Sequence, residues 1–291
     1  MNKIYNIFLL LLCHISFSQT DSTAVERSNI QNYTPSKLLE KGKLDIKWFN
    51  GLYTETRSEN QGVIANKPRE NYFETSLEIF TGVSSRKILN IGLIVAYRSN
   101  TFAGQSAPSV FGFDNEIGKA RSGFSHFAPS IKISPFKKIP NFSIQSSFFI
   151  PVFEKEKDEN GYLANKSYIF QNRFFFDHTF VGSKFQYFTE LSTRYFFGQK
   201  GSGYANNSLE LAPSFFLSYF ATKKSTIFGF LQHVQLIDLG NNFEQNYTAS
   251  GIGAKYQLTN VLNIESIYSK FLRANDAGIG QSFNLGLRAI F

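Results

Sequence analysis

The residues of this chain that could do chemistry are mostly charged, and they recur in short segments where polar and apolar residues alternate. In segment 184–197, Glu190 and Arg194 share one face while Tyr187 and Leu191 share the other. Because successive side chains of a strand point to opposite sides, this spacing predicts one charged and one apolar face. Both signs of charge occur on the polar faces, so we expect ion pairing or the selection of charged solutes there.

A set of charged residues on these polar faces forms the candidate lining of a closed sheet. Its members are Glu74, Glu78, Arg173, Asp177, Glu190, Arg194, Glu210, Lys255, Glu265 and Arg288, together with Lys47 and Lys132. An Arg or Lys that faces lipid costs about 2–4 kcal/mol at the bilayer midplane, which favours the inward placement. Two alternatives stay open: an aqueous path that selects solutes by charge, or a lumen filled by mutually neutralising charges.

Two of these residues lie on adjoining segments and are expected to be near neighbours. Arg173 belongs to segment 167–180 and Arg194 to segment 184–197, and a short link joins the two. Like charges that face each other destabilise a sheet, so this arrangement needs a reason. One hypothesis is salt bridging, for instance to Glu210; the other is a basic constriction that favours anions.

Signals for catalysis are weak. None of His126, His178 and His233 has a serine two residues later, which is the spacing of the outer-membrane phospholipase A family. The sequence has no HExxH motif, no Gly-rich phosphate loop and no carboxylate-dense calcium loop. Cys13 is the only cysteine. We therefore expect no enzyme, no cofactor and no metal, and export argues against a nucleic-acid partner despite the net charge of +8.

Segments with a period of two recur from Lys43 to the last residue. We predict strands over 43–56, 72–83, 88–98, 122–134, 141–153, 167–180, 184–197, 208–221, 226–239, 247–258, 260–272 and 280–291. Short links alternate with longer, more polar ones, of which 99–121 and 154–166 are the longest. This alternation is typical of outer-membrane barrels, which have tight periplasmic turns and longer external loops. The last segment, which ends at Phe291, is then the strand that closes the barrel.

Basic residues and aromatic clusters mark the ends of the predicted strands. The short links are basic, with Arg86, Lys87, Lys137, Lys138, Lys184, Lys223 and Lys224. These residues fit either attraction to lipid phosphate or docking of an acidic periplasmic partner. The clusters "SYIFQNRFFFDHTF" (167–180) and "RYFFGQ" (194–199) fit either stacking of sugar rings or apolar ligands or, as we interpret them, aromatic girdles at the membrane interfaces.

The region before the predicted barrel divides into two parts. Residues 1–18 have a charged start, a short apolar run and a small-x-small site, which is typical of a secretory signal peptide. Residues 19–42 form a predicted periplasmic leader. Within it, Thr34 as N-cap, Pro35 at the first helical position and Gly42 as a stop predict one short helix, which lies either in the periplasm or in a mouth of the barrel. The barrel itself is predicted over 43–291.

Two stretches carry a resemblance to a known group of proteins. "TPSKLLEKGKLDIKWFNGLYTETRS" (Thr34–Ser58), with its Leu52-Tyr53-Thr54 motif, resembles the opening of a family of exported barrels from the Bacteroidota. "ISPFKKIPNFSIQSSFFIPV" (Ile133–Val152) is similar to the central hairpin of that family. Its members are similar to barrels labelled as transporters, including those grouped with a phenol-degradation (MetA) pathway. The resemblance brings no functional residues with it.

The sequence therefore predicts an all-β protein, a transmembrane antiparallel up-and-down barrel of about twelve strands in the outer membrane of a Gram-negative bacterium. Both termini are expected in the periplasm. The expected function is a narrow channel or transporter for small solutes; the alternatives are a non-conducting structural or docking barrel and a lipid-modifying enzyme. The expected partners are outer-membrane lipid and the outer-membrane assembly machinery, which would recognise the strand that ends at Phe291.

Overall fold

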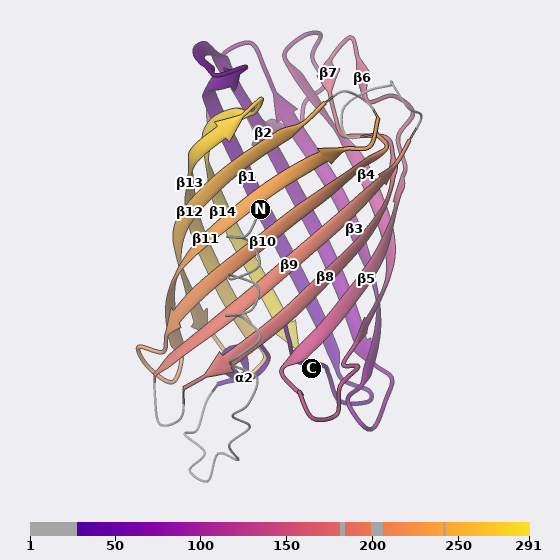
Figure 1. Ribbon diagram of the computed structural model, residues 1–291, viewed down its shortest axis with the longest axis vertical. Coiled ribbons are helices and arrows are strands. Elements are labelled where there is room, and N and C mark those ends of the chain that lie inside the picture. The colour runs from indigo at the N-terminus through magenta and orange to yellow at the C-terminus, as the bar shows by residue number, and fades with distance from the viewer. Residues whose placement is uncertain (1–27, 181–183, 199–205, 241–242) are drawn as a thin grey trace, which may run out of the picture.

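The computed structural model describes residues 28–180, 184–198, 206–240 and 243–291. The chain forms a closed antiparallel barrel of twelve strands, in which each strand pairs with its neighbours along the chain and β1 pairs with β14 (Figure 1). The strands of the barrel are β1 (Leu44–Asn60), β2 (Val63–Gly82), β3 (Leu89–Thr101), β4 (Ala120–Ile133), β5 (Phe142–Pro151), β8 (Tyr168–Thr179), β9 (Phe185–Phe197), β10 (Ser208–Tyr219), β11 (Ser225–Asp238), β12 (Gln245–Gln257), β13 (Leu262–Asn275) and β14 (Gly278–Ile290). The predicted fold class is confirmed, and β14 closes the barrel as expected.

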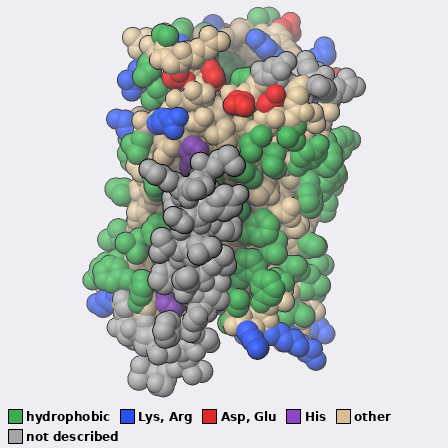
Figure 2. All heavy atoms as spheres, in the orientation of Figure 1, with side chains coloured by type: hydrophobic (Ala, Val, Ile, Leu, Met, Phe, Trp, Pro, Cys, Tyr) green, Lys and Arg blue, Asp and Glu red, His purple; other side chains and the backbone are tan. Residues whose placement is uncertain are grey.

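The alternation of the sequence separates the two faces of the wall. On β14, Phe283 and Leu285 are exposed on the outside, whereas Arg288 faces inward and binds Asp45 of β1. Trp48 of β1 is likewise exposed on the outside. Figure 2 shows hydrophobic side chains over much of the outer wall, with basic groups below them and mixed charges above. Because the sheet is closed, no strand of the barrel has an unpaired edge below this apolar outer face.

The two ends of the barrel differ in the length of their connections. One end, here called the short-turn end, carries the links 83–88, 134–141, 180–184, 220–224 and 258–261. The chain enters β1 and leaves β14 at this same end. The other end, here called the loop end, carries the long links 102–119 and 152–167.

The largest difference from the predicted strand boundaries lies between β1 and β2, whereas the other boundaries differ by at most three residues. Residues 57–71 were expected to form a polar link, but β1 and β2 continue as a hairpin to a two-residue turn at Gln61 and Gly62. Both turn residues have positive φ, 50° and 85°, which is the geometry of tight hairpins. The sequence hides this extension because a register shift between Glu55 and Arg57 interrupts its alternation.

The predicted helix over 34–42 is wrong. The only described helical turn before the barrel is α2 (Asn29–Asn32), and the residues after it are irregular. Their backbone groups bind side chains of the barrel wall: Lys132 donates to the carbonyl oxygens of Pro35 and Lys37. Partners from the wall therefore replace the intrahelical bonds that the Thr-Pro start and the Gly stop would otherwise support. The predicted signal peptide, 1–18, lies outside the described residues.

The two long loops fold in opposite directions from the loop end. Loop 102–119 contains a short 3-10 helix, η1 (Ala107–Gly112), and lies against the outer wall, where Val110 is fully buried and its carbonyl accepts from Ser99. Loop 152–167 contains the small hairpin of β6 (Lys157–Asp158) and β7 (Gly161–Tyr162) and folds into the barrel mouth. Among the described residues, no helix is long and apolar enough to cross a membrane.

Candidate functional site

The interior of the barrel at the short-turn end is occupied by residues 28–43, here called the plug segment. Ser36 and Leu39 of this segment are almost completely buried. Leu39 packs with Phe80, Ile94 and other inward-facing apolar residues of the wall, and its amide donates to Asn90 Oδ1 at 3.3 Å. The plug segment is thus part of the packed interior of the barrel.

Charged side chains from distant strands hold the plug segment. Lys132 of β4 donates to two of its carbonyl oxygens, and Arg288 of β14 donates to the carbonyl of Tyr33. Asp177 of β8 accepts from Thr34 Oγ1 at 3.0 Å and from Ser36 Oγ, and Lys37 Nζ lies 4.0 Å from it. Only β5 separates β4 from β8, whereas β14 lies across the barrel from β8, so the segment is bound from two opposite sides of the opening.

Above the plug segment, inward-facing charges form ion pairs between neighbouring strands. Arg173 of β8 binds Glu190 of β9 in a bidentate pair, with Nε–Oε1 at 2.7 Å and Nη2–Oε2 at 3.2 Å. Lys47 Nζ lies 3.5 Å from Glu78 Oε2. Arg173 also interacts electrostatically with Glu78, which belongs to β2. Because β2 and β8 are not neighbours in the sheet, this interaction crosses the lumen.

A second group of charges lies nearer to the loop end. Arg194 of β9 pairs with Glu210 of β10 at 3.5 Å, and Glu74 of β2 pairs with Arg98 of β3. Arg194 and Glu74 also interact electrostatically, again between strands that are not neighbours. Nearly half of the side-chain surface of Arg194 and Glu74 is exposed, at 45% and 47%. Water thus reaches this level of the lumen.

The sequence-predicted charged residues therefore fall into ion pairs or bind the plug segment. Lys255 and Glu265 form a further pair at 2.5 Å between β12 and β13, and Arg288 pairs with Asp45 at 2.7 Å. The sequence reasoning missed Asp45 and Arg98, although both carry a signal. Asp45 lies two residues from Lys47 on the same face of β1, and Arg98 has the inward parity of its segment.

One side of the inner wall is aromatic, which the interpretation of the clusters as girdles did not include. Phe175, Phe188, Phe216 and Phe230 stack in sequence across β8 to β11, with ring centroids 6.0, 5.5 and 5.1 Å apart. The Arg173 guanidinium lies over the Phe175 ring at 4.9 Å. We call these four residues the aromatic track. The girdle interpretation was wrong for Phe175, because three consecutive Phe residues, 174–176, place aromatic rings on both faces of β8.

At the loop end, loop 152–167 lies against the inner face of β3 and β4. The buried Arg121 of β4 donates to the carbonyl oxygens of Glu156 and Gly161 at 2.9 Å, and its Nε lies 3.1 Å from Asp158 Oδ2. Asn100 of β3 donates to the carbonyl of Leu163 at 2.8 Å. These bonds fix the loop to one side of the mouth.

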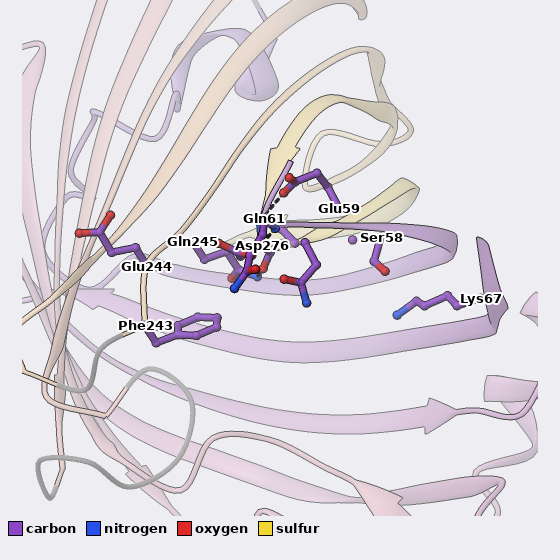
Figure 3. Close-up of a pocket in the computed structure, with 11 residues that line it drawn as sticks. Ser58, Glu59, Gln61, Lys67, Phe243, Glu244, Gln245 and Asp276 are labelled. Carbon is purple, nitrogen blue, oxygen red and sulfur yellow. Dashed lines mark hydrogen bonds between the residues drawn. The ribbon is translucent and has the colours of Figure 1, made fainter. Parts of the chain in front are cut away.

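A cavity of about 520 Å³ opens at the rim of the loop end, between the β1–β2 and β13–β14 turns. Figure 3 shows Glu59, Gln61 and Asp276 close together, with Phe243 and Lys67 on opposite sides. The amide of Gln61 donates to Asp276 Oδ1 at 3.1 Å, and the amide of Asp276 donates to Glu59 Oε2 at 2.6 Å. These carboxylates connect the two hairpin turns and form one wall of this cavity.

The three histidines of the described ranges lie apart from one another. His126 faces the lumen beside Phe149 and Phe153, whereas the Nδ1 atom of His233 is 2.9 Å from Thr248 Oγ1. His178 contacts aromatic rings near the short-turn end. Within the described ranges, no group of three or more His, Cys, Asp or Glu side chains is arranged to hold a metal ion.

Comparison with known proteins gives a likeness in fold. No family model matches the chain, and no curated protein matches it. An outer membrane channel from Pseudomonas putida F1 superposes with a TM-score of 0.72 at 9% identity, over 89% of this chain and 99% of that one. The beta domain of the Bordetella autotransporter BrkA superposes with a TM-score of 0.53 at 10% identity, over 85% and 99% of the two chains. The chain thus has the fold of outer-membrane barrels, with the channel as the more similar of these two.

Proposed function

We propose that this protein is an outer-membrane channel for small solutes, with both termini in the periplasm. The observation that carries the proposal is the contrast between the faces of the wall: apolar outside, charged and partly hydrated inside. In hydrocarbon every backbone N–H and C=O must be paired internally, and a closed sheet meets that condition. Exposed side chains such as Trp48, Leu285 and Ile252 would be costly in water and are suited to lipid.

The location is tested by fractionation of cells that express the full chain. We expect the protein in the outer-membrane fraction, with faster gel migration before boiling than after it, as folded barrels show. Recovery of the full chain as a soluble periplasmic protein would reject the proposal. In this location, the strand that ends at Phe291 would be the segment presented to the assembly machinery.

Conduction depends on the plug segment. The charged levels around Arg194 and Arg173 are hydrated or half-buried, whereas the short-turn end is filled by buried contacts. We therefore propose a channel that is closed at the short-turn end and conducts when the plug segment leaves its site. Planar-bilayer recordings should show low, intermittent conductance for the full chain.

The side chains that line the lumen favour one class of solute. An aromatic track beside arginine and lysine side chains offers stacking to a ring and ion pairing to a charged group. We propose small solutes that combine an aromatic ring with an anionic group. Liposome uptake of benzoate relative to acetate should fall when Phe216 and Phe230 are both replaced by Ala, whereas Phe215→Ala, on the outer face, should leave the ratio unchanged. An equal loss for both acids in the double variant would reject this solute class.

The mutual pairing of the lumen charges favours a second candidate function, a non-conducting structural barrel. In that case the barrel would stay closed even without the plug segment. A variant that lacks residues 28–42, folds and shows no conductance would favour this candidate over the channel.

A further inference from the structure

A groove of about 210 Å³ lies on the outer wall near the loop end. It is formed where the pairing of β1 with β14 shifts between Glu55 and Ser58, so that the wall is locally open. Its lining includes Arg57 of β1, Arg69 of β2 and Lys270 of β13. In the sheet register Lys270 pairs with Gln281, which on its other side pairs with Thr54. These three residues lie on the same outer face as the exposed Phe283. The groove therefore opens outward, not into the lumen.

The three basic side chains of this groove are exposed and have no acidic partner. Among the described residues, none of Arg57, Arg69 and Lys270 forms an ion pair with a carboxylate. Glu55 also lines the groove, but Lys67 Nζ binds its Oε1 at 2.5 Å and Tyr53 donates to its Oε2 at 2.6 Å. The groove thus presents basic side chains without an ion-paired carboxylate at the loop-end border of the apolar wall.

The backbone around the groove is held in place. Loop 102–119 lies on the outer wall beside it, and the amide of Gly104 donates to the carbonyl oxygen of Arg69 at 3.1 Å. On the other side, Gly280 lies so close to the backbone of Thr54 that a Cβ would collide with the Thr54 carbonyl. Arg57, Arg69 and Lys270 therefore project from three strands whose relative position is fixed.

Directly below the basic groove, toward the middle of the wall, the outward row becomes apolar. Two residues along each strand from Lys270 and Gln281 lie Tyr268 and Phe283, whose rings are 5.2 Å apart. Tyr268 OH donates to Gln281 Oε1 at 3.1 Å and so connects the two rows. A ligand that fits both rows has an anionic head and an apolar tail.

We propose that this groove binds the phosphate group of a membrane lipid in the leaflet at the loop end, an inference that rests on the membrane location proposed above. Arg57 and Arg69 supply planar donors that suit phosphate oxygens, and Lys270 adds a point charge. The alkyl chains of the lipid lie along Tyr268 and Phe283. The lipid occupies the outer wall and takes no part in solute passage.

The test uses the full chain in micelles of a neutral detergent and follows binding by native mass spectrometry. The probes are diphosphoryl lipid A, the same lipid after removal of its phosphates, and inorganic phosphate. Since each basic residue near an anionic surface adds appreciable attraction, we expect diphosphoryl lipid A to bind about tenfold or more tightly than its dephosphorylated form.

Two triple variants locate the site. R57Q/R69Q/K270Q should lose most of the preference for the phosphorylated lipid. K137Q/K138Q/K224Q, which removes the same charge from exposed turns at the short-turn end, should keep it. Heat-dependent gel migration checks that both variants are folded barrels.

Three outcomes would overturn the proposal. The first is equal binding of both lipids by the wild-type protein, which would show that the phosphate groups are not recognised. This outcome can be observed without any variant. The R57Q/R69Q/K270Q variant could fold and keep the full preference. Inorganic phosphate could displace lipid A at equal concentration, which would assign the groove to a free anion. None of these readouts involves conductance, so the proposal can fail while the channel function stands.

Discussion

The two mouths of this barrel are occupied by different parts of the chain, which are held in different ways. At the short-turn end, the plug segment is bound by Lys132 and Asp177 on one side of the opening and by Arg288 on the other. At the loop end, loop 152–167 is fixed by Asn100 and Arg121, which belong to the adjacent strands β3 and β4. One mouth is crossed by its occupant, and the other is narrowed from one side.

In the proposed channel, this difference indicates which mouth would control passage. The charged residues Glu74 and Arg194, near the loop end, are substantially exposed, whereas Asp45 and Lys132, near the plug segment, are buried. In the proposed channel, solutes that enter from the loop end would meet exposed charged side chains first and the buried plug segment last. The plug segment would then be the main barrier, and its removal should matter more than any change at the loop end.

The largest expected effect follows removal of the plug segment. A variant that lacks residues 28–42 should conduct steadily in planar bilayers, because the buried contacts that fill the short-turn end are gone. The matched change at the other mouth is deletion of residues 155–160 from loop 152–167. It should alter conductance much less than removal of the plug segment does. An equal effect of the two deletions would contradict the conclusion that the plug segment is the main barrier.

A single substitution should loosen the plug segment without removing it. Lys132→Met leaves the carbonyl oxygens of Pro35 and Lys37 without their buried donor, which costs about 1–3 kcal/mol. The population with a displaced plug should rise on the order of tenfold to a hundredfold, since about 1.4 kcal/mol corresponds to a factor of ten. The open fraction in single-channel recordings measures this population.

The control for this change is Lys255→Met, which removes a lumen lysine of similar chemistry. Lys255 binds Glu265 and lies 5.3 Å from the ring of Phe228. It should leave the open fraction near that of the wild type. If Lys255→Met raised the open fraction as much as Lys132→Met, the closure would depend on lumen charge in general and not on contacts to the plug segment.

The sequence predicted the strands of the barrel wall better than the segments that occupy the lumen. Alternation is a property of each strand by itself, so residues such as Phe283 and Arg288 reveal their faces without knowledge of the fold. The plug segment has no such local signal, because its conformation depends on Lys132 and Asp177, which lie far away in the sequence. A local helix signal at Thr34 and Pro35 was therefore misleading.

Within the site, the sequence located charges but not their partners. Arg194 and Glu210 face each other directly in the sheet register, and Arg173 meets Glu190 on a diagonal. The interaction of Arg194 with Glu74 crosses the lumen, and only barrel closure brings these residues together. Runs such as Phe174–Phe176 are apolar on both faces, so alternation could not predict that the Phe175 ring lies inside.

The paired arginines give the third prediction, which concerns the part of the lumen between the two mouths. Replacement of Arg173 and Arg194 by Gln in the plug-deleted barrel leaves Glu190 and Glu210 without their partners. Because a charge pair in water is worth about 1 kcal/mol at 4 Å, the permeability ratio should shift toward cations by about fivefold. Reversal potentials in a salt gradient measure the ratio.

The opposite change provides the check on the arginine variant. Glu190→Gln with Glu210→Gln should shift the ratio toward anions by a comparable factor. Unchanged selectivity in a folded, conducting arginine variant would leave these ion pairs with a structural role alone. Any selection by charge would then have to arise at the two mouths.

The smallest expected effect lies at the edge of the plug segment, where Glu40 meets Lys87 of the β2–β3 turn at 2.6 Å. The hydrogen bond and charge of Lys87 hold the pKa of the Glu40 carboxyl below its ordinary value near 4.5. A carboxyl whose pKa is lowered in the closed state stabilises closure above its ordinary pKa, and that contribution is lost as pH falls through the lowered value. The pair therefore favours the closed plug at neutral pH and not in strong acid.

Because both side chains are exposed, the change should be small, less than about twofold in open fraction. Glu40→Gln should raise the open fraction slightly at pH 7.5, and the difference from the wild type should disappear as the pH falls through the lowered pKa of the wild-type carboxyl. Lys87→Gln should give the same small increase at pH 7.5, and the double variant should add nothing to either single one. A large effect of Glu40→Gln would contradict the comparison, because it would mean that an exposed ion pair at the rim, and not the buried bonds to Lys132, Asp177 and Arg288, keeps this mouth closed.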